Sequence, residues 1–192
     1  MLYRCILLFV VLCSALNGCT VAEHHLDKES DRAVQIAYQH IKQHTSQFAD
    51  IEPENNLLLK NYKKDQLGFQ HLRFQQISQQ IPVWPQELIV HINRENQVYR
   101  VDGELFKVPQ FTLPPKLTPQ DAMLKAINNM DGQWTAKNSE LYIYQHKQAS
   151  ATLAYRVEIN QSLFRQFIFI NANSGVVITR IEGSPSKRLF DE

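Results

Sequence analysis

The 192-residue chain shows one pattern twice: an apolar stripe at helical spacing, followed by stretches in which apolar and polar residues alternate. The first stripe covers residues 30–49, with Ser30 as the expected helix cap. Extended stretches follow at 57–63, 68–77, 83–93 and 97–108. In the second of these, Leu72 and Phe74 alternate with polar neighbours. Alternation with period two is typical of antiparallel strands that have one face in water.

A proline-rich joint separates this pattern from its second occurrence, with three prolines in residues 109–115. After it, Thr118 supplies a helix cap, Pro119 occupies the first helical position, and Asp121 follows the cap by three residues. This combination is a strong signal for the start of a helix. Further strands are expected at 141–146, 152–160, 165–171 and 176–182. The sequence therefore predicts an α+β fold of two small subdomains, each a helix packed on an antiparallel sheet.

The N-terminus has the form of an export signal. Arg4 is followed by an apolar run at 5–16, which is shorter than the ~20 residues of a transmembrane helix. Its end, Leu16-Asn17-Gly18-Cys19, resembles the lipobox of bacterial lipoproteins. We therefore expect a lipoprotein signal peptide at 1–18, a lipidated Cys19 and a tether at 19–29. The alternative is an ordinary signal peptide cleaved near Gly18.

The expected location follows from this signal. Cys5 and Cys13 lie in the removed segment, so Cys19 is the one cysteine left for the lipid, and no internal disulfide is expected. Lipid chains at Cys19 would make the membrane a partner of the protein. Thr20 after Cys19 resembles the outer-membrane sorting pattern of Gram-negative lipoproteins. We expect an exported, lipid-anchored envelope protein, in the outer membrane and facing the periplasm if the host is Gram-negative.

Composition excludes several classes of function. The chain carries 20 Lys+Arg against 19 Asp+Glu, which gives no electrostatic reason to expect a nucleic-acid partner. Loss of Arg4 with the signal leaves 19 of each sign, so shape and strand contacts are the expected means of recognition. Six glycines without a phosphate loop disfavour a nucleotide enzyme.

Catalytic and metal-binding patterns are also missing from the sequence. It contains no His-Glu-x-x-His and no Gly-x-Ser-x-Gly. His40 and His44 have helical spacing for a metal, but no third ligand stands near them in the sequence. We therefore expect no enzyme activity, no cofactor and no metal. Four polar residues of the second and third extended stretches would form a structural ladder if these strands pair: His71, Arg73, Glu87 and His91.

Two blocks of sequence resemble a known pair of modules. Residues 67–76, with Ile81-Pro82-Val83-Trp84 and 87–92, resemble the fungalysin/thermolysin propeptide (FTP) motif. The residues that carry this resemblance are His71, Arg73, Phe74, Gln75, Gln76, Pro82, Val83, Trp84 and His91. Residues 118–126, 153–157 and 167–177 resemble the PepSY domain that follows the motif in peptidase precursors. The chain departs from the FTP pattern at Gln80 and Pro85, where family members usually carry glycine.

The resemblance implies an FTP-like subdomain at 30–110, a joint at 111–117 and a PepSY-like subdomain at 118–182. In the family such a prodomain acts as chaperone and temporary inhibitor of the peptidase to which it is fused. The sequence continues for ten residues after Glu182, so no catalytic domain is expected here. The implied partner is a thermolysin-like zinc metallopeptidase, inhibited or assisted in folding in trans. The other interpretation is a non-inhibitory envelope lipoprotein that binds a peptide, a protein or a cell-wall component.

The C-terminal tail at 183–192 is the part expected to reach the cleft of such a peptidase. Leu189 and Phe190 would occupy its hydrophobic primed-side pocket. Asp191 or Glu192 would approach the zinc ion. The alternative is that the tail is unstructured and has no contact role.

Substitution of the expected lipid attachment site tests the anchoring. Cys19→Ala should move the protein from the membrane fraction to the soluble fraction, because acyl chains on the cysteine are the expected membrane attachment. The measurement is immunoblotting of fractionated cells. A variant that stays in the membrane fraction would show that the lipobox interpretation is wrong.

Overall fold

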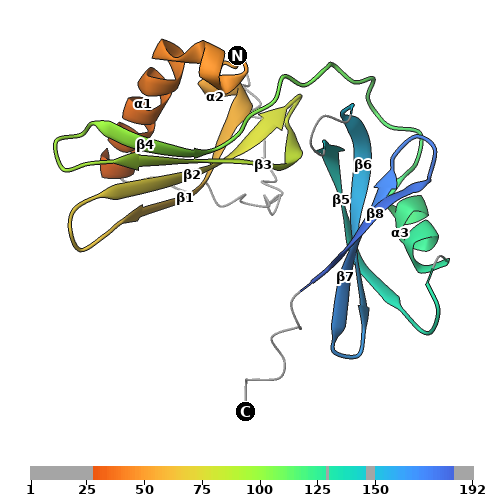
Figure 1. Ribbon diagram of the computed structural model, residues 1–192. Helices are drawn as coiled ribbons and strands as arrows, with labels where there is room; N and C mark the ends of the chain where they lie inside the picture. Colours follow the sequence, from red (N-terminus) through yellow and green to blue (C-terminus); the bar gives the residue numbers. More distant parts are fainter. Residues whose placement is uncertain (1–27, 129, 146–149, 184–192) are drawn as a thin grey trace, which may run out of the picture.

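A computed structural model describes residues 28–128, 130–145 and 150–183 of the chain, which form an α+β fold (Figure 1). The first group of elements is α1 (Lys28–Gln43), the 3-10 helix η1 (Thr45–Phe48), α2 (Pro53–Asn56), β1 (Leu57–Lys64), β2 (Gln70–Ser78), β3 (Ile81–Ile92) and β4 (Val98–Gly103). The second group is α3 (Pro119–Asn128), β5 (Thr135–Tyr144), β6 (Thr152–Gln161), β7 (Phe164–Asn171) and β8 (Val177–Glu182). The predicted fold class is therefore confirmed.

Several boundaries differ from the sequence prediction. The first helix, expected at 30–49, ends at Gln43 and is followed by the short 3-10 helix Thr45–Phe48. Ser30 is buried inside α1 and does not cap it, because the helix already includes Lys28. The strand expected at 97–108 ends at Gly103, whose φ of +108° breaks the ladder; a Cβ there would lie 2.1 Å from the Glu87 carbonyl oxygen. β5 begins at Thr135 rather than at the predicted residue 141. The sequence did not indicate this first half of the strand, because it is mostly polar and exposed and lacks an apolar alternation.

One strand takes part in both halves of the molecule. The strands follow the order β1-β2-β3-β5-β6-β7-β8, and β4 pairs with β3 beside this path. The pairing is antiparallel throughout except between β3 and β5, where Val83 lies opposite Ile143 and Trp84 opposite Tyr144 in parallel. The twelve residues of β3 therefore pair with β2 and β4 in one lobe and with β5 in the other.

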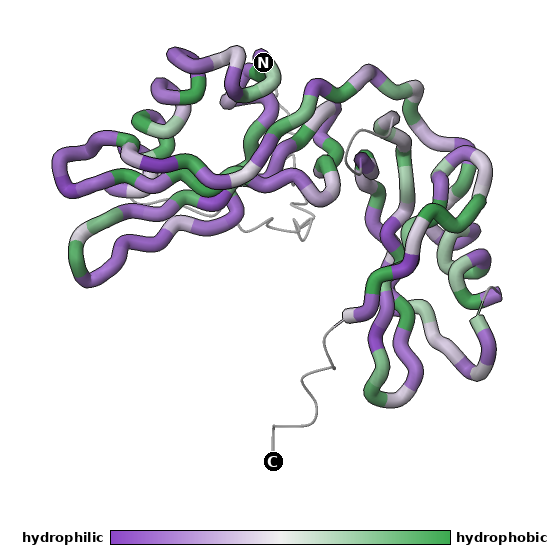
Figure 2. Tube along the Cα trace, in the orientation of Figure 1, coloured by the Kyte–Doolittle hydropathy of each residue, from purple (hydrophilic) through white to green (hydrophobic). Residues whose placement is uncertain are grey.

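The first core lies between α1 and one face of β1–β4. Ala33, Ala37 and Ile41 line the inner face of the helix at three- and four-residue spacing. The opposing sheet positions alternate along their strands, and Leu72 and Phe74 are both fully buried. The hydropathy colouring shows the same alternation of apolar and polar positions along the strands (Figure 2). Burial of one face per element is what holds α1 against the sheet.

The second core lies between α3 and the sheet β5–β8. Ala122 and Ala126 are fully buried and small, which lets the helix lie close to the sheet. The predicted cap is confirmed: the Asp121 backbone N–H donates to Thr118 Oγ1 at 3.1 Å, and the Thr118 N–H donates to an Asp121 carboxylate oxygen at 3.1 Å. The Thr118 hydroxyl also donates to this carboxylate, and these bonds hold the pKa of Asp121 below its ordinary value. Val83 of β3 is fully buried in this core too.

No helix among the described residues is long and apolar enough to cross a membrane.

The β2–β3 connection is a two-residue turn made by Gln79 and Gln80. Both residues have positive φ, 51° and 62°, and Ser78 pairs with Ile81 on either side. A two-residue hairpin turn with both central residues at positive φ is of type I′, which favours glycine and asparagine. Gln79 also binds the segment that connects β4 to α3. The Phe111 N–H donates to Gln79 Oε1 at 2.7 Å, and Gln79 Nε2 donates to the Phe111 carbonyl at 2.9 Å.

This turn supplies a matched pair of substitutions. Gln80 is exposed, so Gln80→Gly should raise the free energy of unfolding by up to about 1 kcal/mol, because it relieves a left-handed backbone conformation. Gln79→Gly relieves the same strain but removes both bonds to Phe111, so it should be neutral or destabilising. Urea unfolding measures both. A Gln80→Gly variant less stable than wild type would contradict the assignment of strain.

Candidate functional site

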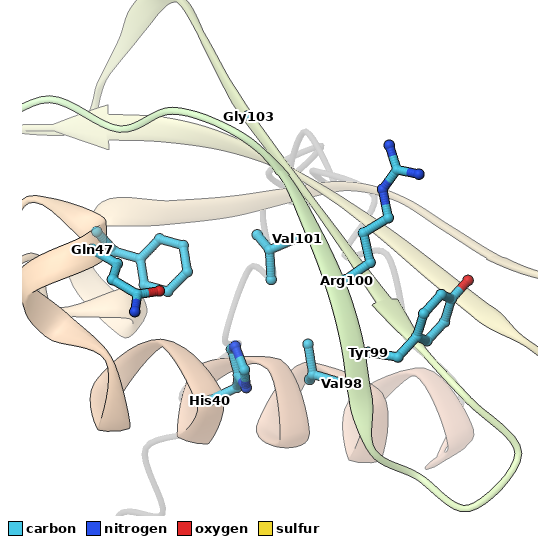
Figure 3. A pocket seen from close by; sticks show the side chains of 8 residues that line it. His40, Gln47, Val98, Tyr99, Arg100, Val101 and Gly103 are labelled. Atoms are coloured by element: carbon cyan, nitrogen blue, oxygen red, sulfur yellow. The ribbon is translucent and has the colours of Figure 1, made fainter.

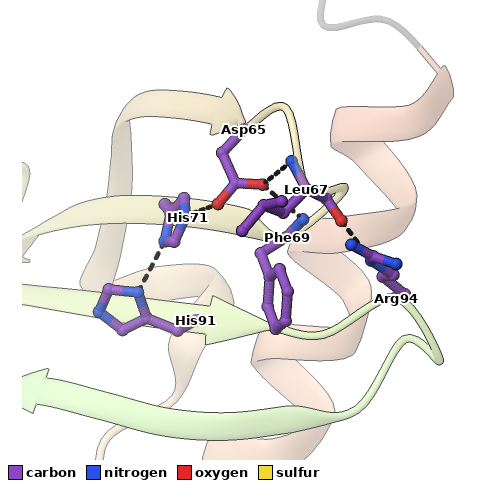
Figure 4. A network of polar contacts seen from close by, with 6 residues as sticks. All are labelled: Asp65, Leu67, Phe69, His71, His91 and Arg94. Atoms are coloured by element: carbon purple, nitrogen blue, oxygen red, sulfur yellow. Dashed lines mark hydrogen bonds and ion pairs between the residues drawn. The ribbon is translucent and has the colours of Figure 1, made fainter.

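A chain of four ionisable side chains crosses the outer face of the first sheet, the face away from α1, and Figure 4 shows three of them, Asp65, His71 and His91. His71 of β2 and His91 of β3 are direct cross-strand neighbours, and their Nδ1 atoms are 2.7 Å apart. His71 Nε2 lies 3.3 Å from a carboxylate oxygen of Asp65, and His91 Nε2 lies 3.0 Å from one of Asp102. The two histidines of the predicted polar ladder are therefore direct neighbours, and two aspartates extend their contacts beyond what the sequence indicated.

Hydrogen bonds join the four groups in a single row from one aspartate to the other. An ionised carboxylate only accepts, so each Nε2 donates to its aspartate. Between the two Nδ1 atoms, one ring donates a hydrogen to the lone pair of the other.

The two aspartates are stabilised in their charged form. Hydrogen bonding from Arg100 is the main cause that holds the pKa of Asp102 below its ordinary value, and His91 adds to it against the opposing effect of burial. For Asp65, burial is the largest single influence and opposes ionisation. The backbone N–H groups of Phe69 and Leu67, together with His71, outweigh it and lower the pKa. This face is therefore a set of charges held by mutual hydrogen bonds.

Two glutamines that carry the FTP resemblance form hydrogen bonds to backbone groups of the chain. Gln75 Nε2 donates to the carbonyls of Val83 and Gln86, each at 2.7 Å, across the register shift between β2 and β3. Gln76 is 2 % exposed; its Nε2 donates to the Phe106 carbonyl at 2.6 Å, and its Oε1 accepts from the Phe106 N–H at 3.1 Å. These amides replace ladder bonds where the strands diverge, so they fix the path of β3 and of the connection after β4.

Trp84 anchors β3 on the second sheet. Its ring centroid is 5.5 Å from that of Phe169 and 5.9 Å from that of Tyr142. Arg156 stacks within this cluster: its guanidinium carbon lies 5.6 Å from the Trp84 centroid and 4.8 Å from that of Tyr142, and it donates to Glu140 at 2.6 Å. Burial is the main cause that raises the pKa of Tyr142 to about 12. The cluster occupies the sheet face away from α3.

The remaining residues of the motif have packing and pairing roles. Arg73 donates to Glu87 at 2.5 Å, although its direct cross-strand neighbour is Ile89. Phe74 is fully buried in the first core, and Pro82 is half-buried at the start of β3, opposite Ile77. Alternation along the strands did not indicate the contact of Asp65, which lies in the loop between β1 and β2, or that of Asp102, which meets His91 across the pairing of β3 with β4. Arg156 is far from Trp84 in sequence and reaches it only because β3 pairs with β5.

Several predicted site residues lie outside the described part of the chain. These are Cys19 and the tail residues Leu189, Phe190, Asp191 and Glu192. The His40–His44 pair is described: the ring centroids are 4.4 Å apart, and His44 Nδ1 bonds to the His40 carbonyl at 2.8 Å. No group of three or more metal-ligating side chains occurs among the described residues.

Comparison with known proteins confirms the resemblance for the segment that contains this site. Residues 55–105 match the Fungalysin/Thermolysin Propeptide Motif. The matched segment runs from the end of α2 to Leu105. It therefore contains His71, His91, Gln75, Gln76 and Trp84.

Curated relatives extend the similarity beyond that segment. The chain is 29% identical to bacillolysin of Bacillus subtilis (strain 168) over 155 residues, which is 75% of this chain and 29% of that protein. It is 33% identical to bacillolysin of Brevibacillus brevis over 124 residues, 57% of this chain and 23% of that protein. The chain thus spans less than a third of the length of these relatives. Among solved structures, the Bacillus megaterium YpeB C-terminal domain superposes with a TM-score of 0.43 at 15% identity, covering 79% of this chain and 64% of that one.

Acid titration tests the aspartate at one end of the histidine chain. Asp102 has a lowered pKa in the folded state, so its contribution to stability is present above the unfolded-state value of about 4 and is lost as the pH falls through the lower folded-state value. Asp102→Asn should therefore lose less stability than wild type between about pH 5 and about pH 3. Thermal unfolding at several pH values measures this. Glu104→Gln, at an exposed carboxylate two residues away, is the control; an Asp102→Asn variant with the acid dependence of wild type would contradict the expected result.

Proposed function

From the propeptide motif at residues 55–105, we propose that this chain acts in trans on a thermolysin-like zinc metallopeptidase, as its inhibitor, its folding chaperone or both. The match of this segment, with every motif residue placed on the paired strands β2 and β3, is the observation that carries the proposal. The alignment with bacillolysin over 75% of the chain supports it. The chain itself is proposed to have no catalytic role. In this proposal it is exported and held at the envelope by a lipid on Cys19.

A protein that binds a peptidase as a template needs a surface whose shape is set before binding. Here Gln75 and Gln76 fix the backbone where β3 leaves the first lobe, and Trp84 fixes it where β3 enters the second. The two sheets therefore present their outer faces in a defined relation, which lowers the conformational entropy lost on binding. Subdomain boundaries at 30–110 and 118–182, with the second PepSY-like, are part of this proposal.

The tail is proposed as the inhibitory element. β8 ends at Glu182, and the Gly183 N–H donates to the Arg165 carbonyl at 2.8 Å, so the last described residue is held at the edge of the second sheet. Residues 184–192 start from this fixed point. Leu189 and Phe190 would then occupy the apolar pocket beside the scissile bond, and Asp191 or Glu192 would approach the zinc ion.

The decisive experiment uses purified residues 20–192, which include the whole described fold, and Bacillus subtilis bacillolysin. We expect near-stoichiometric inhibition of peptide hydrolysis, a higher yield of active enzyme on refolding from denaturant, or both. The measurements are the residual peptidase activity at increasing molar ratio and the refolding yield. Neither effect on several thermolysin-like peptidases would contradict the proposal and would leave the non-inhibitory envelope lipoprotein as the function to test.

Deletion of residues 183–192 tests the tail separately. If the tail blocks the cleft, the deletion should abolish inhibition and leave any effect on refolding intact, since the two sheets remain. A doubly substituted protein, Leu189→Ala with Phe190→Ala, is the milder version and should weaken inhibition without loss of the fold. Unchanged inhibition by the deleted protein would show that another surface blocks the peptidase.

A further inference from the structure

A cavity lies beside the outer edge of the first sheet, between β4 and the end of α1 (Figure 3). Its volume is about 330 Å³. Val98 and Val101 of β4 form one wall. Phe48 of η1 also lines the cavity. His40 and Gln47 form the helical side. Burial is the main cause that lowers the pKa of His40, with His44 adding to it, so this wall of the cavity is uncharged at neutral pH.

The strand beside this cavity offers backbone hydrogen-bonding groups. In the described part of the chain, β4 pairs with β3 and with no second strand. In an antiparallel pair, every second residue of an edge strand directs its N–H and C=O groups away from its partner. An edge of this kind accepts an added strand. The cavity lies on the α1 side of the same edge, where alternate side chains of such a strand would point.

On the other side of this edge, basic side chains stand in a row beside the carboxylates of Asp65 and Asp102. Lys63, His71, His91 and Arg100 are direct cross-strand neighbours in β1, β2, β3 and β4. The side chain of Arg100 ends this row and is 65% exposed, although it also bonds to Asp102. A strand added to β4 would place its next cross-strand side chain beside Arg100. An acidic residue there would meet the exposed guanidinium of Arg100, whereas a basic one would be repelled by it. Two residues along β4, beside Asp102, an acidic residue would be repelled instead.

We propose that the outer edge of β4 binds an extended peptide as an additional strand. An apolar side chain of the peptide enters the cavity between Val98, Val101 and Phe48, and an acidic side chain one position away lies beside Arg100. The ligand class is therefore a peptide with alternating apolar residues and one acidic residue among its polar positions, recognised through its backbone by strand addition. This site is separate from the proposed peptidase role and requires no peptidase.

The probe is a fluorescein-labelled octapeptide in which leucine alternates with serine except for one central glutamate, and fluorescence anisotropy with residues 20–192 measures its affinity. Two further peptides test the chemistry. The same octapeptide with lysine in place of the glutamate should bind more weakly. N-methylation at alternate residues removes the N–H groups of one edge of the peptide. Methylation of one edge should abolish binding and methylation of the other should not, because an added strand pairs through a single edge.

Variants locate the site on the protein. Gln47 is exposed at the mouth of the cavity, so Gln47→Trp should fill the cavity and weaken binding more than about tenfold, the value of one buried apolar side chain. Gln120→Trp, at an exposed position of α3, is the matched control and should bind as wild type. Arg100→Glu should reduce the preference for the glutamate peptide over the lysine peptide by about threefold or more, and Arg32→Glu, exposed on α1, should not.

Circular dichroism and thermal unfolding of each variant establish that the fold is retained. Three results would overturn the proposal: no binding of the glutamate peptide at millimolar concentration, equal loss with either methylated edge, or full affinity in a folded Gln47→Trp variant. All three leave the peptidase proposal standing, because inhibition and refolding are measured without this peptide. Conversely, a failure of the peptidase assay leaves peptide binding intact.

Discussion

The hydrogen bonding of β3 to two different sets of strands is the constraint on which the rest of the structure depends. Its C-terminal half lies between β2 and β4, and Val83 and Trp84 pair with β5. A strand cannot remain in register with both sheets unless the backbone between them is held. Gln75 holds it by donating to the carbonyls of Val83 and Gln86, and the Trp84 cluster holds its far end. The two lobes are thus connected by a paired strand as well as by the proline-rich segment.

This constraint explains why the motif residues are of these types. A glutamine amide both donates and accepts, so it can replace a pair of ladder bonds, as Gln76 does with Phe106 and Gln79 with Phe111. Aspartate or lysine could make only half of each pair. Phe74 fills the first core beneath the same strands. The residues of the propeptide motif therefore have structural roles. In our proposal they act by fixing the shape of the surfaces that contact a peptidase.

The outer face of the first sheet carries ionisable side chains that hydrogen bonds hold in a fixed arrangement. His71 and His91 are hydrogen-bonded through their Nδ1 atoms, and Asp65 and Asp102 accept from their outer nitrogens. Because all four groups depend on one another, the face is a single electrostatic unit rather than a set of independent exposed residues. Arg100, bound to Asp102, connects this unit to the free edge of β4. The proposed peptide site thus lies at the border of the charged face.

The sequence alone determined the fold class, most strands, the cap at Thr118 and the propeptide resemblance, because each depends on residues close together in the chain. It also placed His71 and His91 on facing strands. Only the tertiary structure decided that Asp65 and Asp102 complete their chain, that Arg156 stacks on Trp84, and that β3 belongs to both lobes. These contacts depend on loops and on strand pairings rather than on the pattern within one strand. Periodicity assigns a residue to a face of its own strand, whereas the partners on that face depend on how the strands are arranged in space.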